Sequence, residues 1–122
     1  MWIFPNDAAL SIVKDRRDPA RLMVRARVAG DIERIFPSAH ETEEADYRYR
    51  ASILRSDVSA TLAQRAESID YDNFKNSCDM PRHNAYMNVW ESWMGVARRL
   101  KRAGPDVAPC ATSDGACAAR RA

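Results

Sequence analysis

The chain has few of the residues that build metal, cofactor and disulfide sites. Its 122 residues include two histidines, three cysteines and four glycines. The glycines stand apart from one another, which excludes a glycine-rich phosphate loop. The cysteines, Cys78, Cys110 and Cys117, are odd in number and follow no repeating spacing, unlike the disulfide framework of a secreted protein. Cys78 and His83 have no second ligand pair at a zinc spacing, so we expect no metal site and no cofactor.

Long hydrophobic runs and a strong charge of either sign are also missing. No run approaches the roughly 20 apolar residues of a membrane span. The segment Met1–Asp7 has neither the basic nor the apolar stretch of a signal peptide, so we expect a cytoplasmic protein without a membrane partner. Net charge is +2, from 19 basic and 17 acidic residues. This balance does not favour general binding to nucleic acids, so any electrostatic role must come from local clustering.

Two segments, Leu22–Val28 and Tyr47–Ile53, alternate with period two. In each, every second residue is apolar or aromatic, and two arginines lie between these residues. Successive side chains of a strand face opposite sides of a sheet, so each segment offers one side to a core and the other to solvent. If both strands belong to one sheet, four guanidinium groups share its open face. These are Arg25, Arg27, Arg48 and Arg50.

The first half of the chain indicates strands and the second half helices. Strands are expected at 2–4, 8–14, 22–28 and 47–53, and a short helix at 32–36 with Asp31 as its N-cap. This order is typical of an α+β fold, here a mixed or antiparallel four-stranded sheet with helices packed on one face. We expect a single domain over residues 1–103 and a disordered C-terminal tail over residues 104–122.

Two longer helices are expected after the last strand. The first follows Ser56 as its N-cap, and its apolar stripe consists of Val58, Leu62, Ala66 and Ile69. The second is the longest, beginning near Pro81 and ending before Gly104. Its apolar residues recur at steps of four and three. They are Tyr86, Trp90, Trp93, Ala97 and Leu100.

Several of these segments together resemble a group of small bacterial cytoplasmic proteins. The resemblance is carried by Trp2-Ile3-Phe4 with Asn6-Asp7, Leu10-Ser11-Ile12-Val13, Val24-Arg25-Ala26-Arg27, Gly30-Asp31-Ile32-Glu33, and Ile69-Asp70-Tyr71-Asp72-Asn73-Phe74-Lys75. It covers roughly residues 1 to 95. It implies a bacterial cytoplasmic protein but no activity, so it assigns no functional residue.

The four arginines are the first candidate binding site. A cluster of guanidinium groups suits an anionic ligand, such as a nucleic-acid backbone, a phosphorylated molecule or an acidic protein surface. The alternative is a solvated sheet face whose arginines pair with acids. The acidic segment 41–46 immediately precedes the last strand and could neutralise them.

The stripe of the last helix is the second candidate. Trp90, Trp93 and Met94 would give apolar contacts at a partner interface, where tryptophan and methionine are favoured. A homodimer through this helix would use the same residues. The alternative, and the more frequent fate of such a stripe, is that it covers the apolar face of the sheet.

No catalytic motif accompanies these surfaces, and we predict no catalytic residues. Cys78, Asp79 and His83 are the one neighbourhood that could serve a small hydrolase or transferase. An active thiolate would need an electropositive pocket and an oriented base, and the sequence indicates neither.

The sequence therefore favours a small non-enzymatic bacterial protein-binding module, such as an inhibitor or accessory factor, whose partner presents an acidic surface. The first alternative is a nucleic-acid-binding module that places the same arginines on phosphates. Proteins that bind single strands also carry aromatic side chains on the basic face. Tyr47 and Tyr49 are expected on the opposite side, which counts against that alternative. A small hydrolase or transferase is the third hypothesis.

Overall fold

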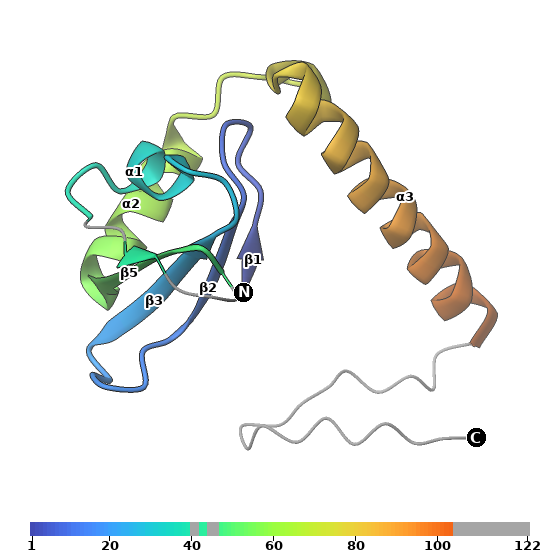
Figure 1. The fold of residues 1–122 in the computed structure, drawn as a ribbon. Helices are drawn as coiled ribbons and strands as arrows, with labels where there is room; N and C mark the ends of the chain where they lie inside the picture. The colour runs from blue at the N-terminus through green and yellow to red at the C-terminus, as the bar shows by residue number, and fades with distance from the viewer. Residues whose placement is uncertain (40–41, 44–46, 104–122) are drawn as a thin grey trace. The chain divides into compact units, whose positions relative to one another are not determined.

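The structure is a computed structural model that describes residues 1–39, 42–43 and 47–103. The chain divides into two compact units, Met1–Tyr86 and Met87–Ala122, and each is described by itself. The first unit holds the sheet and two helices, and the described part of the second is helical (Figure 1). The single domain expected over residues 1–103 stays a prediction. The tail expected over residues 104–122 lies outside the described residues.

An antiparallel sheet forms the centre of the first unit. Within the described residues it has five strands in the order β1-β2-β3-β5-β4. The α+β prediction is confirmed, and antiparallel pairing throughout decides between the two expected sheet types. The four expected strands are present, and the short β4 adds to them from the segment expected as an acidic loop. The strands are β1 (Trp2–Ile3), β2 (Leu10–Lys14), β3 (Arg21–Ala26), β4 (Thr42–Glu43) and β5 (Tyr49–Leu54).

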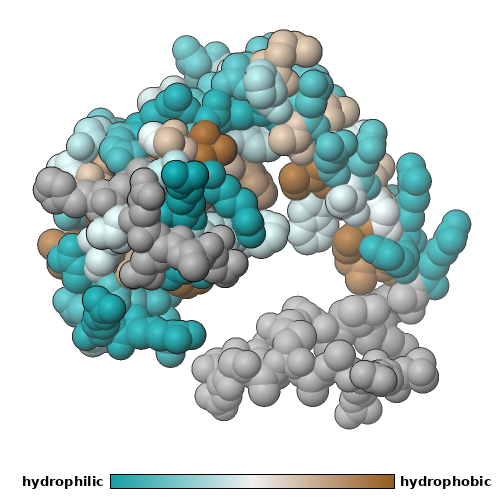
Figure 2. Space-filling view, in the orientation of Figure 1, coloured by the Kyte–Doolittle hydropathy of each residue, from teal (hydrophilic) through white to brown (hydrophobic). Residues whose placement is uncertain are grey.

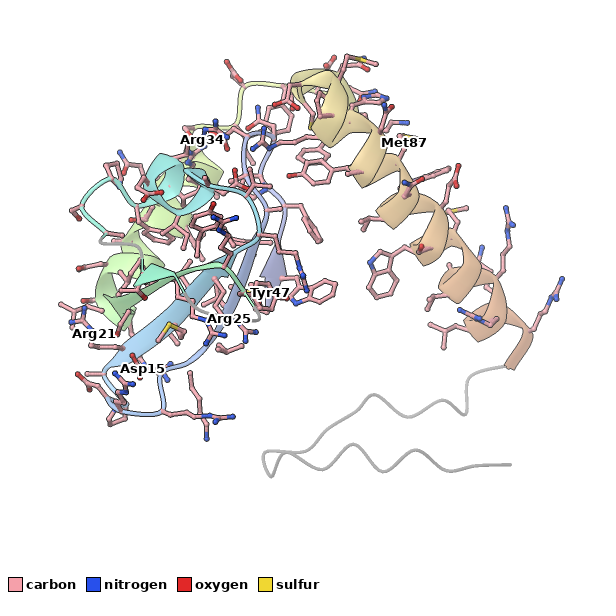
Figure 3. All side chains as sticks on the ribbon, viewed as in Figure 1. Asp15, Arg21, Arg25, Arg34, Tyr47 and Met87 are labelled. Carbon is pink, nitrogen blue, oxygen red and sulfur yellow. The ribbon has the colours of Figure 1, made fainter. Side chains whose placement is uncertain are left out.

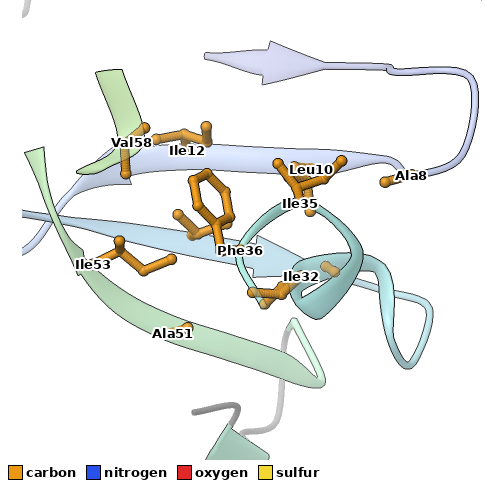
Figure 4. Close-up of a cluster of buried hydrophobic side chains, with 11 residues drawn as sticks. Ala8, Leu10, Ile12, Ile32, Ile35, Phe36, Ala51, Ile53 and Val58 are labelled. Carbon is orange, nitrogen blue, oxygen red and sulfur yellow. The ribbon is translucent and has the colours of Figure 1, made fainter. Parts of the chain in front are cut away.

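Two helices, α1 (Asp31–Ile35) and α2 (Arg55–Glu67), lie on the same side of this sheet. The period-two alternation predicts the core correctly within β3 and β5, whose alternate residues are buried beneath these helices (Figure 4). Val28 continues the pattern but follows the end of β3 and is exposed. The strand residues of this core are Leu10, Ile12, Val24, Ala26, Ala51 and Ile53, and the helices and the segment after α1 add Ile32, Ile35, Phe36 and Val58.

The entry into α1 differs from the expectation. Gly30 is the N-cap, with a φ of 81° in the left-handed region that favours glycine. Asp31 is the first helical residue and does not cap the first turn with its side chain. Its carboxylate is buried and accepts a hydrogen bond of 3.0 Å from the backbone N–H of Ala9 instead. The physical reason is that the β1–β2 connection brings an amide that needs a partner to this position.

The predicted stripe of α2 is only half correct. Val58 is buried and Leu62 packs against the core, but α2 ends at Glu67 and Ile69 is exposed. After α2, a 3-10 turn, η1 (Lys75–Ser77), leads to the long helix α3 (Met80–Ala103). The first turns of α3 belong to the first unit.

Tyr86 ties these first turns of α3 to the sheet. Its single O–H hydrogen is shared by the carbonyl oxygens of Pro5 and Ala8, at 3.0 and 2.6 Å. Its ring stacks on Phe74 and contacts Phe4. Burial raises the pKa of Tyr86 to about 12.

Candidate functional site

A single cross-strand row brings the basic residues of the open sheet face together. In the register of the sheet, Trp2 lies opposite Ser11, Ser11 opposite Arg25, Arg25 opposite Arg50, and Arg50 opposite Thr42. Directly opposed residues of antiparallel strands project to the same face. This face is the one opposite the buried apolar residues of the strands. Arg25 and Arg50 are therefore neighbours, as the alternation predicts.

Tyr47 contacts three of the four arginines. The guanidinium carbons of Arg25 and Arg27 lie 4.3 and 4.6 Å from the centre of its ring, within the range of cation–π contacts. The Nε of Arg50 donates to the backbone carbonyl of Tyr47 at 3.2 Å. Figure 3 labels Arg25 and Tyr47 beside each other at this place in the sheet. We refer to Tyr47, Arg25, Arg27 and Arg50 as the Tyr47 cluster.

Arg48 does not join the Tyr47 cluster. Its guanidinium lies 5.7 Å from the ring of Tyr49, and Tyr49 packs against the core. The expected opposite orientation is therefore correct for Tyr49 and wrong for Tyr47. Both Tyr47 and Arg48 precede the first residue of β5, so the alternation of the strand does not extend to them.

The charges of Arg25 and Arg27 are not matched by a carboxylate in the described part of the chain. Arg25 donates to the Ser11 hydroxyl at 2.9 Å, and both guanidinium groups contact the Tyr47 ring. The Nε of Arg25 is buried and has no hydrogen-bond partner among the described residues. Ser11 and Tyr47 fix the position of Arg25, while Arg27 stays exposed. The arrangement holds positive charge at a defined place on the surface.

Aromatic side chains accompany this charge. Trp2 is 70% exposed and belongs to the same cross-strand row as Arg25. A small hollow of about 130 Å³ lies beside the cluster and is lined in part by Trp2, Phe4, Arg27 and Tyr47. The sequence analysis missed this grouping, because Trp2 joins the row only through the β1–β2 pairing.

At the other end of the same face, the positive charge of an arginine is balanced by a carboxylate in a hydrogen-bond network. Arg21 donates from Nε to the Ser52 hydroxyl at 2.9 Å, and this hydroxyl donates to Asp15 at 2.5 Å. The Ser52 hydroxyl, together with the backbone N–H of Arg17, lowers the pKa of Asp15 below its ordinary value. The Ser52 hydroxyl therefore bridges Arg21 and the Asp15 carboxylate. The network connects β3 and β5 with the end of β2.

In the second unit, the predicted helix residues lie on α3. Trp90 and Trp93 are 51% and 65% exposed, and Met94 is 37% exposed. Figure 2 shows hydrophobic and hydrophilic side chains next to one another along this helix.

The Cys78 neighbourhood lacks the geometry of a nucleophilic site. The Cys78 thiol donates to the Phe74 carbonyl, His83 contacts the Lys75 carbonyl through Nδ1 at 2.8 Å, and Asp79 binds Arg82 at 2.6 Å. Burial raises the pKa of the Cys78 thiol, which disfavours the reactive thiolate. Each side chain has a separate local partner, so no acid–base relay links them.

The described residues also lack a metal-binding group and a membrane-spanning helix. Over residues 1–39, 42–43 and 47–103, the histidine, cysteine, aspartate and glutamate side chains form no group of three that could hold a metal ion. Within the same residues, no helix has the length and apolar character needed to cross a membrane.

Comparison with protein-family models, with curated proteins and with solved structures found no match to this chain.

Proposed function

We propose that this chain is a small non-enzymatic interaction module that binds an acidic surface of another protein through the Tyr47 cluster. The observation that carries the proposal is the placement of Arg25 and Arg27 on one tyrosine ring without a carboxylate partner among the described residues. Like charges held close together repel each other, so the arrangement costs energy until an anion arrives. Guanidinium groups suit carboxylates because their planar fork matches two oxygens.

The positioning of these arginines supports binding without a large reorganisation. Arg25 is held by the Ser11 hydroxyl on one side and by Tyr47 on the other. A pre-positioned side chain loses less conformational entropy on binding than a free one. Arg48 is not expected to contribute to the same contact, since its guanidinium lies over Tyr49. An inhibitor or an accessory factor is a role that this size and surface fit.

A nucleic-acid-binding module is the second candidate, and one observation favours it. Tyr47 lies on the same face as Arg25 and Arg27, and the exposed Trp2 belongs to the same cross-strand row. Base stacking on such rings would supply the aromatic contacts that single-strand binders use. Tyr47 therefore lies with the arginines, and not on the opposite side as the alternation predicts.

The experiment compares Arg25→Gln/Arg27→Gln with the wild type and with a control, Arg16→Gln/Arg17→Gln. Arg16 and Arg17 are exposed residues of the β2–β3 loop, so the control removes the same charge outside the cluster. Each protein is used to capture partners from nuclease-treated lysate. A captured partner is then purified, and its affinity for the wild type and for each variant is measured. We expect one partner with an acidic surface that the control retains and Arg25→Gln/Arg27→Gln loses. Retention of every partner by a folded Arg25→Gln/Arg27→Gln protein would refute the proposal.

Fluorescence anisotropy with labelled oligothymidine tests the second candidate directly. An affinity that falls steeply between about 50 and 200 mM salt would indicate phosphate contacts. Substitution of Trp2 by alanine should then weaken binding by about 1–3 kcal/mol, the range for one stacked base. Absence of binding at low salt would leave the protein-binding proposal as the only one that the cluster supports.

A further inference from the structure

The part of α3 that follows Tyr86 has an unusually wide apolar side. At about 100° per residue, its apolar residues cover about half of the helix circumference. Six of them are Met87, Trp90, Trp93, Met94, Val96 and Leu100. The seam of a two-stranded coiled coil is a narrower stripe, built from two positions in seven. The width of this side indicates that it binds a broad apolar surface and not a single partner helix.

Four of these six residues are exposed, and Met87 and Val96 are half-buried. Trp93 is 65% exposed and Leu100 is 48% exposed, and Trp90 is exposed by about half of its surface, 51%. Tryptophan, with an apolar body and an N–H group, is enriched at the boundary between lipid chains and water.

The charge of the same segment is strongly positive. Between residues 87 and 103, Arg98, Arg99, Lys101 and Arg102 stand against the one acidic residue, Glu91. A parallel pair of such helices would bring two basic ends together. An antiparallel pair would set each basic end against the start of the segment, where Glu91 is the one carboxylate available to four basic residues. The charges therefore disfavour a second copy of this chain and favour an anionic occupant.

We propose that α3, from Met87 onward, lies in the surface of an anionic lipid bilayer. Its apolar side would enter the boundary between headgroups and acyl chains, and Arg98, Arg99 and Arg102 would contact lipid phosphates. Lys101 lies within the apolar side, between Trp90 and Met94 around the helix axis, and its long stem lets the ammonium group reach the headgroups. This placement is compatible with the finding that no described helix can cross a membrane, because a helix in the surface spans nothing. A helix bound in the lipid surface would differ from the sequence-based expectation of no membrane partner, and the vesicle experiment decides between the two.

The test uses the full chain carrying Trp2→Phe, so that tryptophan emission reports on Trp90 and Trp93 alone. Vesicles of phosphatidylcholine are compared with vesicles of phosphatidylcholine and phosphatidylglycerol in equal parts, by flotation and by fluorescence. We expect flotation and a blue-shifted emission with the anionic vesicles only. Arg98→Gln/Arg99→Gln/Arg102→Gln should weaken vesicle binding on the order of a hundredfold, since each basic residue near an anionic surface contributes about fivefold.

Two further variants keep the result interpretable. Trp90→Ser/Trp93→Ser should abolish flotation, while Arg16→Gln/Arg17→Gln should float like the parent protein. Circular dichroism must show that each variant retains its helix content. Equal binding to neutral and anionic vesicles, or no flotation at all, would overturn the proposal. Sedimentation showing a dimer that Trp90→Ser/Trp93→Ser dissolves would overturn it too, in favour of a second copy. The Tyr47 cluster is unaltered in all of these proteins, so this outcome is independent of the proposed protein-binding function.

Discussion

Replacing Asp31 should destabilise the first unit more than any exposed acidic substitution. Its side chain is 1% exposed, and its carboxylate receives three hydrogen bonds. The donors are the backbone N–H of Ala9 at 3.0 Å, Arg34 at 3.2 Å and Arg82 at 2.7 Å. These contacts join the β1–β2 connection, α1 and the first turns of α3 at one buried charge.

The magnitude follows from what each substitution leaves behind. Asp31→Ala orphans the Ala9 amide and removes one partner of a buried ion pair, a change that costs about 3–5 kcal/mol. Arg82 keeps its bond of 2.6 Å to Asp79, and Arg34 is half exposed, so we expect the lower end, about 3 kcal/mol. Asp31→Asn keeps the shape and one acceptor but loses the charge, and should cost about 1–2 kcal/mol.

Urea unfolding followed by circular dichroism measures these differences. Asp70→Asn is the matched control, because Asp70 is exposed and surface substitutions stay within about 0.5 kcal/mol. The free energy of unfolding should fall in the order Asp70→Asn, Asp31→Asn, Asp31→Ala. If Asp31→Ala were as stable as the Asp70→Asn control, the buried network would not hold these elements together.

Three shorter predictions concern other contacts. Tyr86→Phe should remove the one tyrosine whose ionisation, followed by absorbance at 295 nm, occurs near pH 12. Because the pKa of Tyr86 is raised in the folded protein, its contribution to stability is complete below pH 10 and is lost between pH 10 and about pH 12. Because the pKa of Asp15 is lowered in the folded protein, its ionised carboxylate stabilises the fold above the ordinary carboxyl pKa, and this stability is lost as the pH falls through the folded pKa. Asp15→Asn should therefore narrow the difference between the urea midpoints at about pH 6 and about pH 3. An unchanged difference would contradict this. Ile32→Ala, at a fully buried position, should cost about 2–5 kcal/mol, whereas Ile69→Ala, at an exposed one, should stay within about 0.5 kcal/mol in the same urea assay.

The sequence predicts the fold well where a simple periodicity is combined with a buried face. The alternation in β3 and β5 identifies Val24, Ala51 and Ile53 as core residues, and all three are buried. It fails where an element ends before its pattern does. Ile69 continues the spacing of Val58 and Leu62, but α2 stops at Glu67 and leaves it exposed. Periodicity alone contains no signal for such an end.

The candidate site is less predictable, because it depends on pairing between strands. The alternation places Arg25 and Arg50 on one face, and their direct opposition follows only from the β3–β5 register. Tyr47 falls two residues before β5 begins, so its ring turns to the side that alternation assigns to the arginines. Trp2 reaches the same row through a two-residue strand. None of these placements could be derived from spacing along the chain.

The two candidate surfaces can be separated by their chemistry. The Tyr47 cluster is charged and pre-positioned, and its contacts lie within the first unit. The segment of α3 after Tyr86 combines a wide apolar side with a basic end and belongs to the second unit. Salt should weaken both contacts, in their rate of formation and in their affinity, because both bring arginine side chains to an anionic surface. If the surfaces act on different partners, Arg25→Gln/Arg27→Gln will leave vesicle binding intact and Trp90→Ser/Trp93→Ser will leave capture of the acidic partner intact. Loss of both activities in either protein would instead mean that one partner needs both surfaces.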